Sequence, residues 1–298
     1  MIRIDLRVEL NYEVEAPGAD FIFNVQAART PRQTIVAEGL MLNQAVPQRM
    51  HTDQASGNRY LYVHALPGEL RLVYSATVDL AHHFAEPAGI AEVPICDLPP
   101  EAIGYIYPSR YCQSDMLTRL AIGEFGNLRQ GYARVLAIQD WVRNSVKFTT
   151  NSSNSNTSAI DTLAQHVGVC RDFAHLMIAL CRAVNIPARF ASGTDYGADP
   201  ALGLPDFQAY VEVYLGDRWY IFDPSGTAIP MGFVRFGTGR DAADVSFATI
   251  FGTVRSPAPG IRAVAVNDPA HGMVLPYPCH AALSTDGVRD GPLFVASR

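Results

Sequence analysis

Strict alternation of apolar and polar residues at the N-terminus is the strongest constraint on the fold. Every even position from Ile2 to Val14 is hydrophobic or aromatic, and a period of two is typical of a β-strand with one buried face. A second run takes the even positions from 70 to 80, directly after the turn signal Pro67-Gly68. Other strand-like runs lie at 21–25, 34–42 and 60–65. We therefore predict an N-terminal antiparallel β-sandwich over residues 1–85, with a small barrel as the alternative.

The rest of the chain has a different pattern. Residues 86–112 are rich in proline and are predicted to be a linker. Helical periodicity begins after Ser114-Asp115, which are good N-cap types, and further helical and strand patterns follow. The sequence thus predicts an α+β chain with a second domain over 113–255 and a C-terminal extension over 256–298.

Composition excludes several classes of protein. The formal net charge is -6, which argues against a nucleic-acid binder because such proteins need basic residues to neutralise phosphates. No segment approaches 18 uninterrupted apolar residues, and the N-terminus does not resemble a targeting signal. The five cysteines are widely spaced and contain no Cys-x-x-Cys pair, which disfavours a disulfide scaffold or a structural zinc site. We expect a cytoplasmic protein that contacts neither nucleic acid nor membrane.

One cysteine stands where chemistry is possible. The segment from Gly168 to Met177 reads GVCRDFAHLM, and its apolar spacing predicts a helix that begins near Cys170. Exposed amide groups and the helix dipole stabilise a thiolate at such a position, by about 0.3–1 kcal/mol. This is less than one pKa unit, so a working nucleophile would also need a base.

A hairpin follows downstream. The runs 206–215 and 218–224 flank the turn Gly216-Asp217, which is typical of a β-hairpin. Positions 208 and 223 lie at the ends away from the turn, so the two strands can bring them near each other.

Together these segments resemble the transglutaminase-like superfamily, a papain-related group. The likeness is greatest to bacterial members that carry an N-terminal β-domain. It rests on GVCRDFAH around Cys170, on AYVEVYL after Gln208 and on the FDP motif at Asp223. The resemblance implies a core of helices packed on an antiparallel sheet, with a Cys–His–Asp triad. Cys170 matches the nucleophile and Asp223 the orienting acid, but the position of the family's histidine is Gln208.

The missing histidine leaves the base open. Glutamine cannot accept and release a proton as imidazole does, and a general base typically supplies about 10²–10⁴-fold in rate. His175 lies five residues after Cys170, about 140° around the helix axis, and is expected to be structural. His166 precedes the helix and could turn toward the thiol. His271 and His280 lie in a C-terminal segment whose path the sequence does not fix.

Two acids near the motifs have competing interpretations. Asp172 falls in the first helical turn, where an acid suits the dipole, and this structural role is favoured over a catalytic one. Glu212 shares a strand face with Gln208 and is either a carboxylate of the site or a buried partner for arginine.

Three functional hypotheses follow. The first is a cysteine hydrolase or acyltransferase that acts on peptide or side-chain amides through Cys170, without a metal or organic cofactor. The second is an inactive member that binds a peptide or protein partner, and Gln208 favours it. The third is a structural protein in which Cys170 is incidental, which the presence of both Cys170 and Asp223 disfavours. The sequence indicates no oligomeric state.

Overall fold

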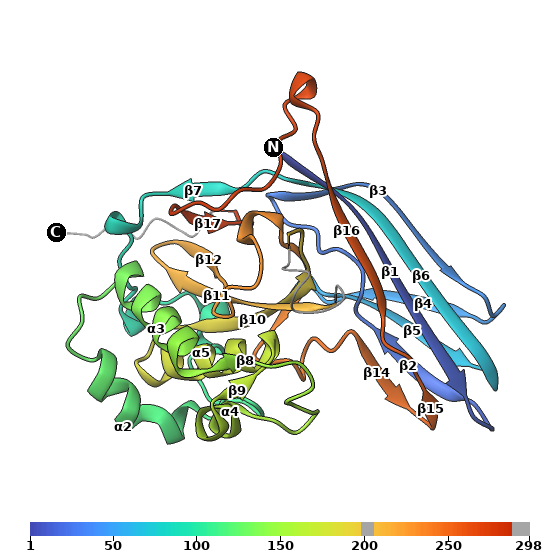
Figure 1. Ribbon diagram of the computed structural model, residues 1–298, viewed down its shortest axis with the longest axis horizontal. Coiled ribbons are helices and arrows are strands. Elements are labelled where there is room, and N and C mark those ends of the chain that lie inside the picture. The colour runs from blue at the N-terminus through green and yellow to red at the C-terminus, as the bar shows by residue number, and fades with distance from the viewer. Residues whose placement is uncertain (198–205, 288–298) are drawn as a thin grey trace.

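The computed structural model describes residues 1–197 and 206–287, and its strands gather into a β-sandwich beside a mixed α+β domain (Figure 1). One sheet of the sandwich has the order β15-β1-β6-β3, with β16 also paired to β1. The other has the order β14-β2-β5-β4. The strand bounds are β1 Ile2–Val14, β2 Ala19–Phe23, β3 Gln33–Leu42, β4 Gln48–Thr52, β5 Arg59–Ala65, β6 Gly68–Leu80, β14 Ala248–Phe251, β15 Val254–Arg255 and β16 Gly260–Val266.

The alternating apolar residues at the N-terminus form the buried face of β1. All its even positions lie in the sandwich core, and β1 pairs with β6 over its whole length, from Ile2 opposite Leu80 to Val14 opposite Gly68. Burial of these side chains contributes most of the stabilisation that such a strand can provide. The predicted sandwich is confirmed.

The C-terminal segments return to this sandwich. β16 pairs with β1 from Val266 opposite Arg3 to Gly260 opposite Glu9, and β14 pairs with β2. Without β16, the outer side of β1 would be an exposed strand edge over these residues, which proteins generally avoid. The structure thus assigns 248–266 to the first domain, whereas the sequence pattern divided this stretch between the core and the extension.

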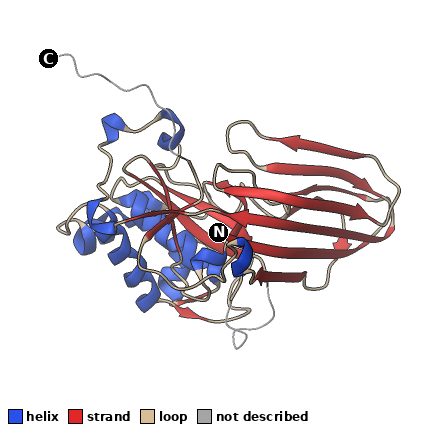
Figure 2. Cartoon of the chain, turned by 90° about the horizontal axis from the view of Figure 1, so that it is seen from above, coloured by secondary structure: helices blue, strands red, loops and turns tan. Residues whose placement is uncertain are grey.

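The second domain is a four-stranded antiparallel sheet of order β12-β11-β10-β13, with helices on one face (Figures 1 and 2). Helix α5 is the central one, and its side chains from Asp172 to Ala183 are all buried. The bounds are α2 Ser114–Phe125, α3 Tyr132–Ser145, α4 Ala159–Gln165, α5 Cys170–Ala183, β10 Ala188–Thr194, β11 Gln208–Leu215, β12 Arg218–Phe222 and β13 Val234–Gly239. This is the predicted helix-on-sheet core.

Short elements join the two domains. The proline-rich segment contains a short helix, and its Leu98 and Ala102 pack on Trp219 of β12, so the segment is anchored to the second domain. The remaining bounds are β7 His83–Ala85, α1 Pro100–Ile103, β8 Lys147–Phe148, β9 Val167–Gly168, β17 Ala282–Ser284, and the 3-10 turns η1 Pro87–Gly89, η2 Ile95–Asp97, η4 Pro230–Gly232 and η5 Pro269–His271.

Candidate active site at the start of helix α5

Helix α5 begins at Cys170, as the sequence predicts. The Asp172 carboxylate turns back and accepts a hydrogen bond from the Val169 N–H through Oδ2, at 2.8 Å. A Cβ at Gly168 would lie 2.8 Å from the Asp172 Cβ, so only glycine fits this approach. Asp172 is fully buried and its other oxygen lies 3.7 Å from Nε of Arg171. Its role is therefore to close the first turn of the helix, which supports the structural interpretation.

The Cys170 thiol lies beside the first residues of β11. Its Sγ is 3.8 Å from the carbonyl oxygen of Phe207. β12 pairs with β11 only from Val211 onward, so the backbone before this residue is free to face the thiol. The end of β12 thus leaves a gap in the hairpin that the start of α5 occupies.

The resting thiol is held protonated by its surroundings. Burial raises the pKa of Cys170 to about 12, and the charges of Asp206 and Asp195 act in the same direction. Backbone hydrogen bonding at Ala209 and Arg171 lowers the pKa, but does not outweigh desolvation. The thiol is therefore protonated at pH 7. Desolvation thus outweighs the small stabilisation of the thiolate by the helix dipole.

Asp223 follows β12 directly and is almost completely buried. Its Oδ1 accepts hydrogen bonds from the N–H groups of Ser225 and Gly226, both at 3.0 Å, and from the Ser225 hydroxyl at 2.6 Å. Its Oδ2 is buried and has no hydrogen-bond partner among the described residues. Burial raises the pKa of Asp223. One oxygen thus fixes the carboxyl in a turn, while the other is unsatisfied.

Gln208 is the first residue of β11 and is half-buried. It pairs with Gly193 of β10. The pairing of β11 with β12 ends at Val211 opposite Phe222, so Tyr210 and Asp223 each lie one residue beyond the last paired residues. Gln208 and Tyr210 share one face of β11 because they are two residues apart. Gln208 thus begins β11 and Asp223 directly follows β12, and a joint role of the two residues stays a prediction.

The sequence did not single out Asp195. It follows β10, and its Oδ2 accepts a hydrogen bond of 3.0 Å from the Tyr210 hydroxyl. Burial raises the pKa of Asp195 to about 7, the Tyr210 hydrogen bond lowers it, and the Asp223 charge raises it. The alternation of side chains along β11 could have identified Tyr210 as a site residue, because it lies on the same strand face as Gln208. Nothing in the sequence pattern indicated Asp195, because its place depends on β10 lying next to β11.

The two histidines nearest in sequence do not serve the thiol. His166 is exposed in a left-handed conformation at the end of α4, with Nδ1 2.9 Å from the Ser145 carbonyl oxygen. His175 is fully buried between the rings of Tyr111 and Phe190, and its Nε2 accepts the Ala242 N–H at 3.1 Å. Burial holds the pKa of His175 well below its usual value, which supports its structural role.

The C-terminal histidines are on the surface. His271 is exposed and its Nδ1 lies 2.7 Å from an Asp268 carboxylate oxygen. His280 is exposed as well. Neither has a contact with Cys170 in the described part of the chain, so no imidazole replaces the one missing at 208.

Glu212 belongs to a buried ion network on the same sheet face. It is 1% exposed and accepts hydrogen bonds from Arg189 at 2.7 Å and from Arg235 at 2.8 and 2.9 Å. Both arginines also bind Asp286. Of the two interpretations left open, the structure supports a buried partner for arginine.

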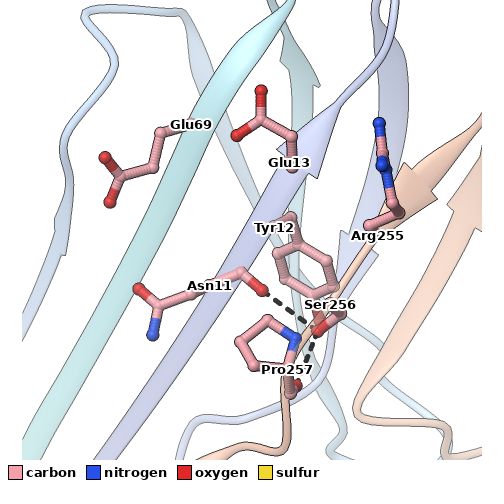
Figure 3. A pocket seen from close by; sticks show the side chains of 7 residues that line it. All are labelled: Asn11, Tyr12, Glu13, Glu69, Arg255, Ser256 and Pro257. Carbon is pink, nitrogen blue, oxygen red and sulfur yellow. Dashed lines mark hydrogen bonds between the residues drawn. The ribbon is translucent and has the colours of Figure 1, made fainter.

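Other possible sites are poor. Residues 1–197 and 206–287 hold no group of three or more side chains suited to a metal ion. None of the helices in these ranges has the length and apolar character that a membrane span requires. A shallow hollow on the sandwich, shown in Figure 3, lies along β1 and β6, where the Ser256 hydroxyl donates to the Asn11 carbonyl. It is lined by Asn11, Tyr12, Glu13, Glu69, Arg255, Ser256 and Pro257, and contains no nucleophile with a base.

Comparison with known proteins agrees with the fold and with the motifs. Residues 120–224 match the family model of the transglutaminase-like superfamily, and residues 2–101 match that of the bacterial transglutaminase N-terminal domain. A crystal structure of a protein from Cytophaga hutchinsonii, described as a candidate cysteine protease, is 37% identical with a TM-score of 0.88. The match covers 95% of this chain and 97% of that one.

Curated relatives match over a smaller part. An uncharacterized protein of Mycobacterium leprae is 30% identical over 117 residues, which are 38% of this chain and 42% of that protein. An uncharacterized protein of Mycobacterium tuberculosis is 31% identical over 109 residues, 33% of this chain and 35% of that protein. The chain thus spans about two fifths of these relatives or less. The family models and the full-length structural match show that the chain belongs to the transglutaminase-like superfamily, with the N-terminal domain of its bacterial members.

Proposed function

We propose that this chain is a cysteine-dependent enzyme that cleaves or transfers peptide or side-chain amides through Cys170, and that it is poorly active until its thiol is activated. The observation that carries the proposal is the place of Cys170, at the start of α5 and against the open end of the β11–β12 hairpin. The C. hutchinsonii protein, similar over nearly its whole length, is described as a candidate cysteine protease.

The chemistry would proceed by acyl transfer. The Cys170 sulfur attacks the amide carbonyl carbon, a C–S bond forms, and the C–N bond breaks as the departing amine takes up the thiol proton. Water or a second amine then attacks the thioester and regenerates the thiol. The Cys170 N–H, at the first turn of α5, is available to hold the developing oxyanion. No metal or organic cofactor enters this scheme.

Binding without turnover is the second candidate, and Gln208 favours it. A glutamine cannot form the thiolate–imidazolium pair that lowers a cysteine pKa by several units, and the resting pKa of Cys170 is about 12. Such a protein would bind a peptide or protein segment beside Cys170 without cleaving it.

We also propose a cytoplasmic location. All five cysteines are free, which supports a reducing compartment.

An acylation assay tests the proposed function. The full chain is incubated with activated thioesters and with peptide amides, and the acyl-enzyme is trapped by acid and mapped by mass spectrometry. We expect an adduct on the Cys170 peptide, slow release of product, and complete loss of both in Cys170→Ala. The matched control is Cys181→Ala, because Cys181 is buried within α5. Binding of the peptides without any adduct on Cys170 would favour the second candidate.

A further inference from the structure

We propose that the stacked rings of Phe207 and Phe247 bind an aromatic or large aliphatic side chain of the substrate, within about three residues of the amide that Cys170 attacks. We call these two rings the aromatic platform. The inference rests on the proposed function and names its substrate class, a peptide with a bulky apolar residue near the scissile amide.

The aromatic platform lies beside the nucleophile. The carbonyl oxygen of Phe207 is 3.8 Å from Sγ of Cys170, and Cys170 is free and partly exposed. The Phe207 ring stacks on the Phe247 ring, with 4.3 Å between the centroids and 11° between the ring planes. Because an extended peptide spans about 3.5 Å per residue, a side chain about two or three residues from an amide at the sulfur can reach these rings.

Phe247 is fixed by the sandwich but keeps its ring outside the sandwich core. Its backbone carbonyl accepts a hydrogen bond from the Asn24 N–H at 3.0 Å. The next residue, Ala248, begins β14 opposite Phe23 of β2. Ala248 and Ile250 pack against the sandwich core, whereas Phe247 is 39% exposed. The backbone thus holds an accessible aromatic ring at a defined place.

Phe207 is the half of the platform that the second domain provides. It directly precedes β11, and its ring meets that of Phe236 of β13 edge-on, with 6.2 Å between the centroids. The side chain is partly buried against the sandwich core. The platform therefore joins one ring from each domain, and binding sites are common at such interfaces. Because both rings are already in place, little conformational entropy is lost when a ligand binds to them.

The chemistry of the platform selects an apolar partner. A single exposed phenylalanine is ordinary on a protein surface, but this one shares a stack with a residue that contacts the nucleophile. Aromatic rings bind other rings in offset-stacked or edge-to-face arrangements and bury a large apolar area. Neither ring carries a charge or a hydrogen-bonding group, so a polar side chain would gain little there.

Alkylation of Cys170 with peptide-like reagents tests the inference without requiring turnover. The full chain is treated at pH 9 with iodoacetyl-phenylalaninamide and iodoacetyl-glycyl-phenylalaninamide, and with the alanine counterpart of each. The Cys170 peptide is quantified by mass spectrometry, and each rate is divided by the rate with glutathione to remove intrinsic reactivity. We expect the phenylalanine reagent to react about tenfold faster than its alanine counterpart at one or both lengths.

Variants identify the rings as the cause. Phe247→Ala should remove most of this preference, and Phe247→Tyr should keep it. Phe251→Ala is the matched control, because Phe251 is 60% exposed at the other end of β14, opposite Asp20, and its loss should leave the preference unchanged. The ratio of the two rates is the readout, since a general change in access to the thiol would affect both reagents alike. An absent preference in the wild type at both lengths, or an unchanged preference in Phe247→Ala, would overturn the inference.

The two proposals can fail separately. Acyl adducts on Cys170 with peptide amides of every side chain, together with no preference among the reagents, would leave the proposed function standing and refute the aromatic platform. A preference among the reagents without any acyl adduct would refute the enzyme and retain the platform.

Discussion

Replacing Gln208 by histidine should convert a passive thiol into a reactive one. The new imidazole would stand at the start of β11, and we expect it to donate its N–H to Oδ2 of Asp223, which has no hydrogen-bond partner among the described residues. Thiolate–imidazolium pairs lower cysteine pKa values by several units. We therefore expect Gln208→His to bring the pKa of Cys170 from about 12 to about 7 or lower.

The size of the effect follows from two opposing factors. A pKa of about 7 would raise the thiolate fraction at pH 7 from about 10⁻⁵ to about one half. The less basic thiolate is also less nucleophilic, by about 0.4–0.5 log units per pKa unit, so about two log units are lost. The net expectation is an alkylation rate about two orders of magnitude above that of the wild type.

The assay is the rate of iodoacetamide alkylation of the Cys170 peptide between pH 5 and 10, with circular dichroism to confirm the fold. The double variant Gln208→His/Asp223→Asn is the control, because it keeps the imidazole but removes the acid that orients it. Its rate should fall back toward that of the wild type. A folded Gln208→His protein with an unchanged pH profile would refute the reasoning, since it would mean that position 208 does not reach the thiol.

Three further predictions concern stability, each measured by urea denaturation. Burial raises the pKa of Asp195 from 3.8 to about 7, so the protonated carboxyl stabilises the folded state below pH 4 and this stabilisation is lost as the pH rises through 7. Relative to Asp195→Asn, the free energy of unfolding of the wild type should fall by up to about 4 kcal/mol between pH 4 and 8. Equal pH dependence of unfolding in the two proteins would contradict this prediction. Arg235→Met should cost about 3–5 kcal/mol, because it leaves Glu212, which is 1% exposed, with a buried charge that is only partly neutralised, and a cost below 1 kcal/mol would show that the network is not needed. Gly193→Ala should be strongly destabilising, because its Cβ would lie 2.1 Å from a carbonyl oxygen of β13, whereas the control Gly39→Ala meets nothing within 4 Å and should be nearly neutral.

The sequence predicts the fold well where a local pattern has one physical cause. Alternation from Ile2 to Val14 requires a strand with a buried face, and the structure confirms it. The start of α5 at Cys170 also follows from local spacing. By contrast, the pairing of β16 with β1 joins residues about 250 positions apart, and no local pattern encodes such a partner.

The candidate site, like the fold, could be predicted from the sequence only where a local motif specifies it. Cys170, Gln208 and Asp223 lie in short motifs, so sequence reasoning could find them: Cys170 begins α5, Gln208 begins β11 and Asp223 directly follows β12. Asp195 and the pKa of the thiol could not be predicted. Both depend on how many groups surround the sulfur after packing, and desolvation at that position outweighs the helix dipole that the sequence could suggest.

The central claim is that the Cys170 thiol of the free protein is protonated because burial, together with the charges of Asp206 and Asp195, outweighs the hydrogen bonds that favour the thiolate. The most direct test is the pH profile of Cys170 alkylation in the wild type. The account predicts a rate that keeps rising up to pH 10, with no plateau at lower pH. A plateau with a midpoint below pH 7 would contradict it, because a thiolate at that pH requires a base or a positive charge that the described structure does not place beside the sulfur.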